Sequence, residues 1–154
     1  RGWDGETPPV EVIPGVSAMQ AAAALLGSPL MQDFCAISLS DLMTPWDTIR
    51  LRLEAAAQGD FVVALYNPRS RKRDWQLLEA RRIFLKHCSG QTPVGIVREA
   101  YRPEQRVTLT DLQHLEEHCQ AVDMVTTVVI GNSTSYSHQG SMVTPRGYEV
   151  KQTL

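Results

Sequence analysis

The order of apolar and polar residues along the chain predicts strands that alternate with helices. Residues 61–66 are apolar at every position, which is typical of a strand covered on both faces by helices. Further strands are expected at 10–13, 34–39, 93–97, 105–109 and 125–130. The pattern predicts an α/β fold, with a mixed, mostly parallel sheet flanked by helices. Antiparallel pairing is expected near 93–109, where no helix separates two strands.

Capping residues indicate where the helices begin and end. Ser17 and Gln20 form a capping box ahead of an alanine-rich run, and Gly27 stands where a helix C-terminal glycine belongs. Pro45 is suited to the first position of a helix that we expect to reach Gln58. A shorter helix is expected at 110–119, and the tail from 137 onward is loosely patterned.

Ser70 is expected to cap a long helix that reaches about Cys88. Cations surround this cap, and three of them would occupy the first helical turn, the unfavourable end of the helix dipole for positive charge. The simplest compensation is an anionic ligand, with a solvated basic turn as the alternative. Nucleic acid is a weaker candidate, because only Trp75 among the aromatics lies near the cations. The cations are Arg69, Arg71, Lys72 and Arg73.

Composition narrows the class of protein. A chain of 154 residues with 43% hydrophobic and 21% charged residues is the size and composition of one globular domain. Its apolar runs are too short to span a membrane. A net charge of −2 argues against a surface built for nucleic acid. Three widely spaced cysteines make a disulfide framework improbable and favour a reducing compartment.

Residues at the strand ends are the best candidates for chemistry, because open α/β sheets bind ligands beyond the carboxyl ends of their strands. Four junctions qualify: 14–18, 66–73, 97–102 and 124–127. Each alone is equally consistent with a plain turn. His114 and His118 are spaced to share a metal, but no third ligand follows, so no metal site is expected.

Several segments carry a family resemblance. Val-Glu-Val-Ile-Pro-Gly-Val-Ser-Ala at 10–18 resembles the opening of the second half of tetrapyrrole (precorrin) methyltransferases. Within that family, four further segments resemble the precorrin-3B C17-methyltransferases. These segments lie at 64–73, 97–100, 126–133 and 144–148. The resemblance covers nearly the whole chain from Val10.

The resemblance implies a function. Such enzymes have two α/β domains, bind S-adenosylmethionine between them, and are typically cytoplasmic homodimers in cobalamin biosynthesis. The C17 enzyme methylates a precorrin-3-type tetrapyrrole and contracts its ring. The cofactor-binding residues implied here are Ser17, Ala18, Tyr66, Asn67, Ala100, Thr126 and Thr127. The substrate carboxylates would pair with Arg69, Arg71, Lys72 and Arg73.

The same resemblance implies an incomplete site. The chain starts at Arg1 without Met and lacks the glycine-rich loop of the family's first domain. We therefore expect residues 1–154 to be one α/β domain, the C-terminal half of a two-domain enzyme, inactive alone. Alternatives are a sibling precorrin or uroporphyrinogen methylase, or a non-enzymatic module for anionic ligands or dimerisation. Acid and base residues for ring contraction are not assigned; Glu99 and Tyr101 are candidates by position only.

Overall fold

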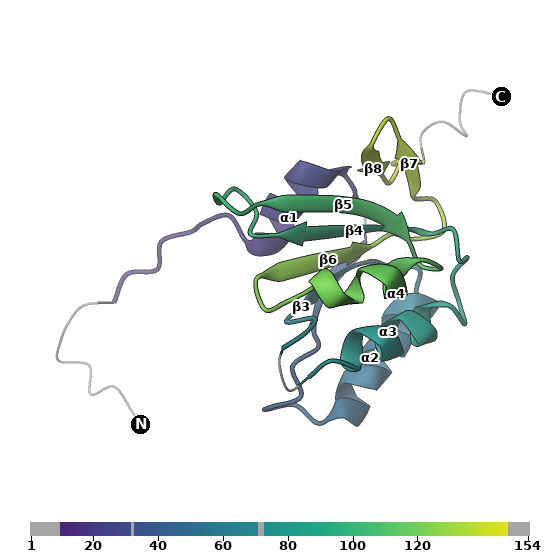
Figure 1. Cartoon of the computed structure of the whole chain (residues 1–154), viewed down its shortest axis with the longest axis horizontal. Coiled ribbons are helices and arrows are strands. Elements are labelled where there is room, and N and C mark those ends of the chain that lie inside the picture. The colour runs from purple at the N-terminus through teal and green to yellow at the C-terminus, as the bar shows by residue number, and fades with distance from the viewer. Residues whose placement is uncertain (1–9, 32, 71–72, 148–154) are drawn as a thin grey trace.

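A five-stranded mixed sheet forms the centre of the molecule (Figure 1). The computed structural model describes residues 10–31, 33–70 and 73–147. The strand order in the sheet is β2-β3-β6-β4-β5. Its strands are β2 (Phe34–Ser38), β3 (Val62–Tyr66), β4 (Pro93–Arg98), β5 (Arg106–Asp111) and β6 (Thr126–Ile130). The predicted α/β class with a mixed sheet is confirmed.

Strand direction differs from the sequence-based expectation. β2 and β3 pair in parallel, whereas β6 runs antiparallel to both β3 and β4, and β5 runs antiparallel to β4. The expectation of mostly parallel pairing is therefore wrong. A strand buried on both faces is apolar whichever way it runs, so the pattern carries no direction. The reversal of β6 brings its first residues beside the last residues of β3 and β4.

Helices cover both faces of this sheet (Figure 1). α1 (Ala18–Leu26) lies on one face. The opposite face carries α2 (Trp46–Gln58), α3 (Gln76–Phe84) and the short α4 (Leu115–His118), which continues into a 3₁₀ turn at Cys119–Ala121. Within the described part of the chain, every helix is too short or too polar to cross a membrane.

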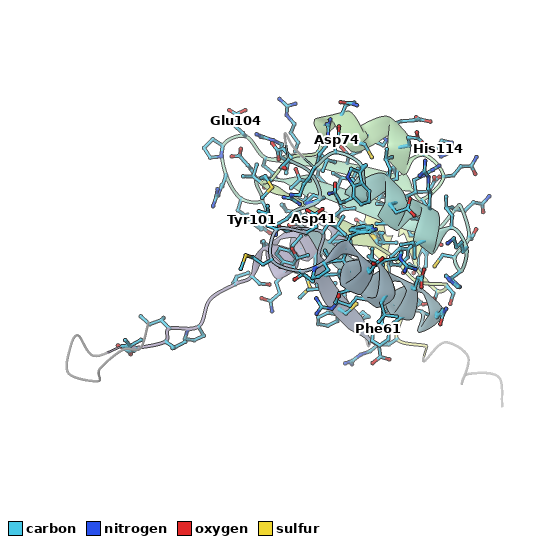
Figure 2. The ribbon with its side chains drawn as sticks, turned by 90° about the horizontal axis from the view of Figure 1, so that it is seen from below. Asp41, Phe61, Asp74, Tyr101, Glu104 and His114 are labelled. Atoms are coloured by element: carbon cyan, nitrogen blue, oxygen red, sulfur yellow. The ribbon has the colours of Figure 1, made fainter. Side chains whose placement is uncertain are left out.

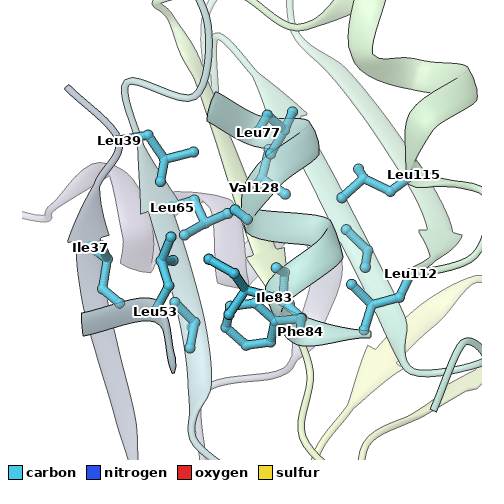
Figure 3. Close-up of a cluster of buried hydrophobic side chains, with 14 of the residues drawn as sticks. Ile37, Leu39, Leu53, Leu65, Leu77, Ile83, Phe84, Leu112, Leu115 and Val128 are labelled. Carbon is cyan, nitrogen blue, oxygen red and sulfur yellow. The ribbon is translucent and has the colours of Figure 1, made fainter. Parts of the chain in front are cut away.

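The side-chain alternation of the central strands divides the core into two clusters. Val63 and Leu65 of β3 point toward α2 and α3, where Phe84 is completely buried (Figure 3). Val62 and Val129 belong to the smaller cluster under α1. Each large apolar side chain buried in this way contributes about 1.5–3 kcal/mol of transfer free energy. The uninterrupted apolar pattern at 61–66 is thus explained by burial on both faces.

The predicted start and end of α1 are confirmed. The Ser17 hydroxyl accepts from the Gln20 backbone N–H, and the Gln20 side chain returns a bond to the Ser17 N–H. Gly27 ends the helix with φ of 123°, a conformation open to glycine. The chain then forms β1 (Gly27–Ser28), which pairs with a hairpin of β7 (Tyr136–His138) and β8 (Ser141–Val143). This small sheet orders part of the tail that the pattern left unassigned.

Three predicted elements are wrong. Residues 10–13 form no strand and are exposed, and no strand in the described part of the chain pairs with them. Ser70 caps no helix: it exchanges backbone hydrogen bonds with Arg73, and α3 begins only at Gln76. β5 continues through residues assigned to the 110–119 helix, which shrinks to α4.

Candidate functional site

Four chain segments converge at one end of the sheet. The carboxyl ends of β3 and β4 meet there, and antiparallel β6 starts at the same end. The N-terminus of α1 reaches the same place, since the Met19 N–H donates to the Tyr66 hydroxyl at 2.8 Å. Figure 2 shows Tyr101 and Glu104 toward this end of the molecule and His114 toward the other.

A pocket of about 410 Å³ lies at this convergence. Six of the seven residues implied as cofactor ligands line it: Ala18, Tyr66, Asn67, Ala100, Thr126 and Thr127. Ser17 does not line the pocket, and its hydroxyl instead caps α1. The remaining lining residues are Val16, Ala21, Val97, Glu99, Arg102, Met124 and Val125. The geometry therefore joins residues up to 111 positions apart in the sequence, from Val16 to Thr127.

The N-terminus of α1 has fewer free N–H groups for binding an anion than the sequence suggested. Helix N-termini attract anions through free N–H groups. Here the Met19 N–H donates to Tyr66, and the Gln20 N–H donates to the Ser17 hydroxyl at 3.3 Å. The Tyr66 hydroxyl thus fixes the helix against β3 and keeps one rim of the pocket in place.

Unusual backbone angles mark the pocket rim. Asn67 and Glu99 line it, and both have positive φ, 51° and 47°. Such angles cost a non-glycine residue free energy and cluster at functional sites in proteins. Local bonds hold both residues: the Asn67 amide donates to the Ser38 hydroxyl at 3.0 Å, and the Glu99 N–H donates to the Val125 carbonyl at 3.0 Å.

Asp123 organises the charges beside the pocket. Its carboxylate accepts from Arg98 Nε at 2.9 Å and from the Thr126 hydroxyl at 2.8 Å, while Arg98 also pairs with Glu99 at 3.0 Å. Burial raises the pKa of Asp123, but the bonds from Thr126, Arg98 and the Val125 N–H outweigh it and lower that pKa. The bond to Asp123 raises the pKa of Arg98 above its ordinary value. The Thr126 hydroxyl is therefore already engaged by Asp123.

The two described cations of the predicted basic cluster do not face one surface. Arg69 is half-buried and lines a second cavity of about 470 Å³, with its guanidinium donating to the Cys119 carbonyl at 3.0 Å and to Gln120. Arg73 is only 7% exposed and points inward. Arg71 and Lys72 lie outside the described residues. The proposed clustering of cations in the first turn of a helix is wrong, because α3 starts beyond them.

Sequence reasoning missed Ala21 and Asp123. Ala21 stands three residues after Ala18, so helical spacing was a signal that both face the same pocket. Asp123 had no such signal, because it precedes β6 in a loop and gains its partners Arg98 and Thr126 through strand pairing. Tyr101, a candidate by position, is 66% exposed and outside the lining, whereas Glu99 lies in it.

Comparison with known sequences decides the family. The family profile described as "Tetrapyrrole (Corrin/Porphyrin) Methylases" matches residues 4–116. The chain belongs to the tetrapyrrole methylase family. Nine of the thirteen residues that line the pocket lie within this matched range. The resemblance carried by segments such as 64–73 is confirmed at the family level.

Curated members of this family give closer matches. A cobalt-factor III methyltransferase of Priestia megaterium is 52% identical over all of this chain, which covers 28% of that protein. A probable cobalt-factor III C(17)-methyltransferase of Salmonella typhimurium is 50% identical over 90% of this chain and 57% of its own length. A precorrin-3B C(17)-methyltransferase of a Sinorhizobium species is 46% identical over 79% of this chain and 47% of its own length. The chain thus spans between a quarter and about three fifths of these relatives.

Solved structures agree with the fold. The crystal structure of the methyltransferase CobJ superimposes with a TM-score of 0.82 at 36% identity, covering 89% of this chain and 56% of that one. A uroporphyrin-III C-methyl transferase from Thermus thermophilus, complexed with S-adenosyl homocysteine, gives a TM-score of 0.57 at 22% identity. It covers 80% of this chain and 52% of that one, and at this identity it supports the fold alone.

Proposed function

We propose that this chain is part of an S-adenosylmethionine-dependent methyltransferase that methylates C17 of a precorrin-3-type tetrapyrrole and contracts its ring in cobalamin biosynthesis. One observation carries the proposal: six residues implied by the family resemblance line a single pocket. Identities of 46–52% to the C17-type and cobalt-factor III enzymes support the substrate class. The chain would form one wall of the cleft, and the part of those relatives that it does not span would supply the other.

The pocket residues fit S-adenosylmethionine. A volume of about 410 Å³ lies within the range of small-molecule sites, roughly 300–1,000 Å³. Ala18, Ala21 and Ala100 leave room for a ring system. Glu99 and Arg102 place opposite charges at the lining, which suits the zwitterionic amino-acid end of the cofactor. When bound, the cofactor supplies an activated methyl group on a sulfonium.

The protein's task in such a transfer is alignment and exclusion of water. The Tyr66–Met19 bond and the Asn67–Ser38 bond hold α1, β2 and β3 in fixed relation at the pocket. Thr126 and Thr127 line the pocket and are only 3% and 6% exposed, so little of either residue meets bulk solvent. Because the sulfonium methyl is already activated, such a transfer needs no catalytic triad.

The tetrapyrrole is proposed to lie across the second cavity. Met124 and Val125 line both cavities, so the two are contiguous. Arg69 lines that cavity and is proposed to pair with a substrate carboxylate, with Arg71 and Lys72 proposed to assist it. A cytoplasmic homodimer is the proposed state of the complete enzyme, as the family resemblance implies.

The test uses the complete gene product and two variants on one helix. Ala18 lines the pocket, whereas Ala24 is exposed on the same helix and does not line it. In calorimetric titrations, Ala18→Leu should lower the affinity for S-adenosylhomocysteine by about tenfold or more, which corresponds to about 1.4 kcal/mol. Ala24→Leu should leave that affinity unchanged. Methyl transfer is then followed with cobalt-containing and metal-free precorrin-3-type substrates.

Three results would contradict the proposal in different ways. If the wild-type protein binds no S-adenosylhomocysteine, the proposed cofactor is wrong and a non-enzymatic module is favoured. Binding that Ala18→Leu leaves intact places the cofactor elsewhere. Turnover only with another precorrin or with uroporphyrinogen retains the cofactor and assigns the chain to a sibling methylase.

A further inference from the structure

Arg73 is a buried cation with an unusual set of partners. It is 7% exposed. Its Nη1 donates to the Asn67 carbonyl at 3.1 Å and to the Leu39 carbonyl at 3.3 Å, and its Nη2 lies 3.1 Å from Met124 Sδ. The Asp41 carboxylate approaches Nε only to 4.0 Å. Most of its hydrogen-bonding capacity is therefore spent on backbone and sulfur rather than on an ion pair.

These partners come from three segments that shape the candidate cofactor site. Leu39 follows β2, Asn67 follows β3, and Met124 precedes β6. Asn67 and Met124 line the pocket itself, and Met124 also lines the neighbouring cavity. One guanidinium thus ties together two strand ends and the loop between the two cavities.

Stability alone does not explain a charge in this position. Burying a cation costs several kcal/mol in effective terms, and apolar side chains of similar volume often replace buried charges without loss. Asp41 supports Arg73 from a partly exposed position and is itself fixed by Gln76, whose Nε2 donates to it at 3.0 Å. The planar guanidinium carries several donors, so it can hold the Leu39 and Asn67 carbonyls, which follow two different strands, at the same time.

Asn67 is the pocket residue whose conformation depends most on Arg73. Its φ of 51° lies in the left-handed region, which Asn adopts more readily than most non-glycine residues. Ser38 fixes the Asn67 side chain, and Arg73 fixes its carbonyl, so both ends of this residue are held. The orientation of Asn67 toward the pocket therefore depends on Arg73.

We infer that Arg73 is a positioning residue of the methyl-transfer site, holding Asn67 and Met124 in place rather than contacting the tetrapyrrole. The inference rests on the proposed function, because it assigns Arg73 to that same pocket. It replaces the expectation that Arg73 pairs with a substrate carboxylate. A displacement of about 1 Å at a reacting site lowers turnover by about 10²-fold, which sets the size of the expected effect.

The experiment compares variants of the complete gene product at a temperature where circular dichroism shows each fully folded. Arg73→Met removes the donors and keeps the volume, whereas Arg73→Lys keeps the charge and can reach fewer acceptors. Arg82→Met is the matched control, because Arg82 lies on α3 with a 69% exposed side chain and pairs with Glu79. Each variant is measured for S-adenosylhomocysteine affinity, kcat, and KM of the tetrapyrrole.

The expected pattern separates positioning from folding. Arg73→Met should lower kcat by about 10²-fold. It should also lower the affinity for S-adenosylhomocysteine, with little change in the KM of the tetrapyrrole. Arg73→Lys should recover part of both losses, and Arg82→Met should match wild type. Folded Arg73→Met with wild-type kcat and cofactor affinity overturns the inference while leaving the proposed function intact. A loss confined to the tetrapyrrole KM overturns it in favour of a substrate contact.

A variant that fails to fold does not end the test. If Arg73→Met is unfolded, Arg73→Lys decides by the same two measurements. If both are unfolded, Asp41→Asn is measured in the same way. It leaves Arg73 in place and removes the charge beside its Nε, although Asp41 also accepts from Gln76 Nε2. Unchanged kcat and cofactor affinity then overturn the inference. Wild-type protein that neither binds the analogue nor methylates contradicts the proposed function itself, which distinguishes the two failures.

Discussion

Gly95 of β4 should be the most sensitive small residue in the sheet. It lies beneath α1, in register with Val129 of β6 and Leu109 of β5. A Cβ built there would lie 2.9 Å from Leu26 Cγ and closer still to both methyl carbons of Leu26. Ordinary contacts of this kind begin at 3.4 Å. Gly95→Ala therefore forces either Leu26 or the whole of α1 to move.

The cost of that movement can be worked from the packing. Leu26 is 2% exposed and ends α1, so it has little free space in which to turn. Overpacking a well-filled core costs about 1–3 kcal/mol. For a chain of this size such a loss lowers Tm by roughly 2–12 °C. Because α1 also carries Ala18 and Ala21, a shift of the helix should weaken cofactor binding as well.

Calorimetric unfolding of wild type and two glycine variants measures this effect. Gly15→Ala is the matched control, because a Cβ at Gly15 meets no atom within 4 Å. Gly95→Ala should unfold at lower temperature and Gly15→Ala at the wild-type temperature. If Gly95→Ala keeps the wild-type Tm, the tight approach of α1 to β4 is refuted. If its Tm falls without any loss of S-adenosylhomocysteine affinity, the coupling of α1 to the pocket is refuted.

Two further substitutions test the site. Tyr66→Phe removes the acceptor of the Met19 N–H, so it should cost about 1–3 kcal/mol and weaken the cofactor analogue; an unchanged urea midpoint would show that this bond contributes nothing. Asp123 has a folded-state pKa below its unfolded value of about 3.9, so its stabilisation is present above that pH and is lost as pH falls through the folded pKa. Asp123→Asn should therefore unfold more easily than wild type at neutral pH, and the difference should shrink below about pH 4; a constant difference from pH 2 to 7 would contradict the assignment.

Local sequence determined much of the secondary structure. The capping box at Ser17, the glycine at Gly27 and the apolar run at 61–66 each depend on neighbouring residues or on burial from both faces, and each was predicted. The strand-end rule located part of the pocket, because Asn67 and Ala100 lie within two residues after β3 and β4. These features are visible in sequence because their physical causes act over a few residues.

Other features exist only through contacts between distant segments. Ser70 carries the residue type of a helix cap, but its backbone pairs with Arg73, and the guanidinium is drawn inside by carbonyls 6 and 34 residues away. The segment 10–13 has the composition of a strand, yet nothing in the described chain pairs with it. A local pattern cannot report either outcome, because the deciding partners are not local.

Strand direction shows most clearly what the sequence determines and what only the tertiary structure decides. The sequence alone determined that 125–130 is a buried strand, and the tertiary structure alone decided that it runs against β3 and β4. That reversal places Thr126 and Thr127 beside Asn67 and Ala100 and gives Asp123 its Arg98 partner. The physical reason is that burial on both faces sets hydrophobicity without direction, whereas hydrogen-bond pairing across the sheet sets direction and so assembles the site.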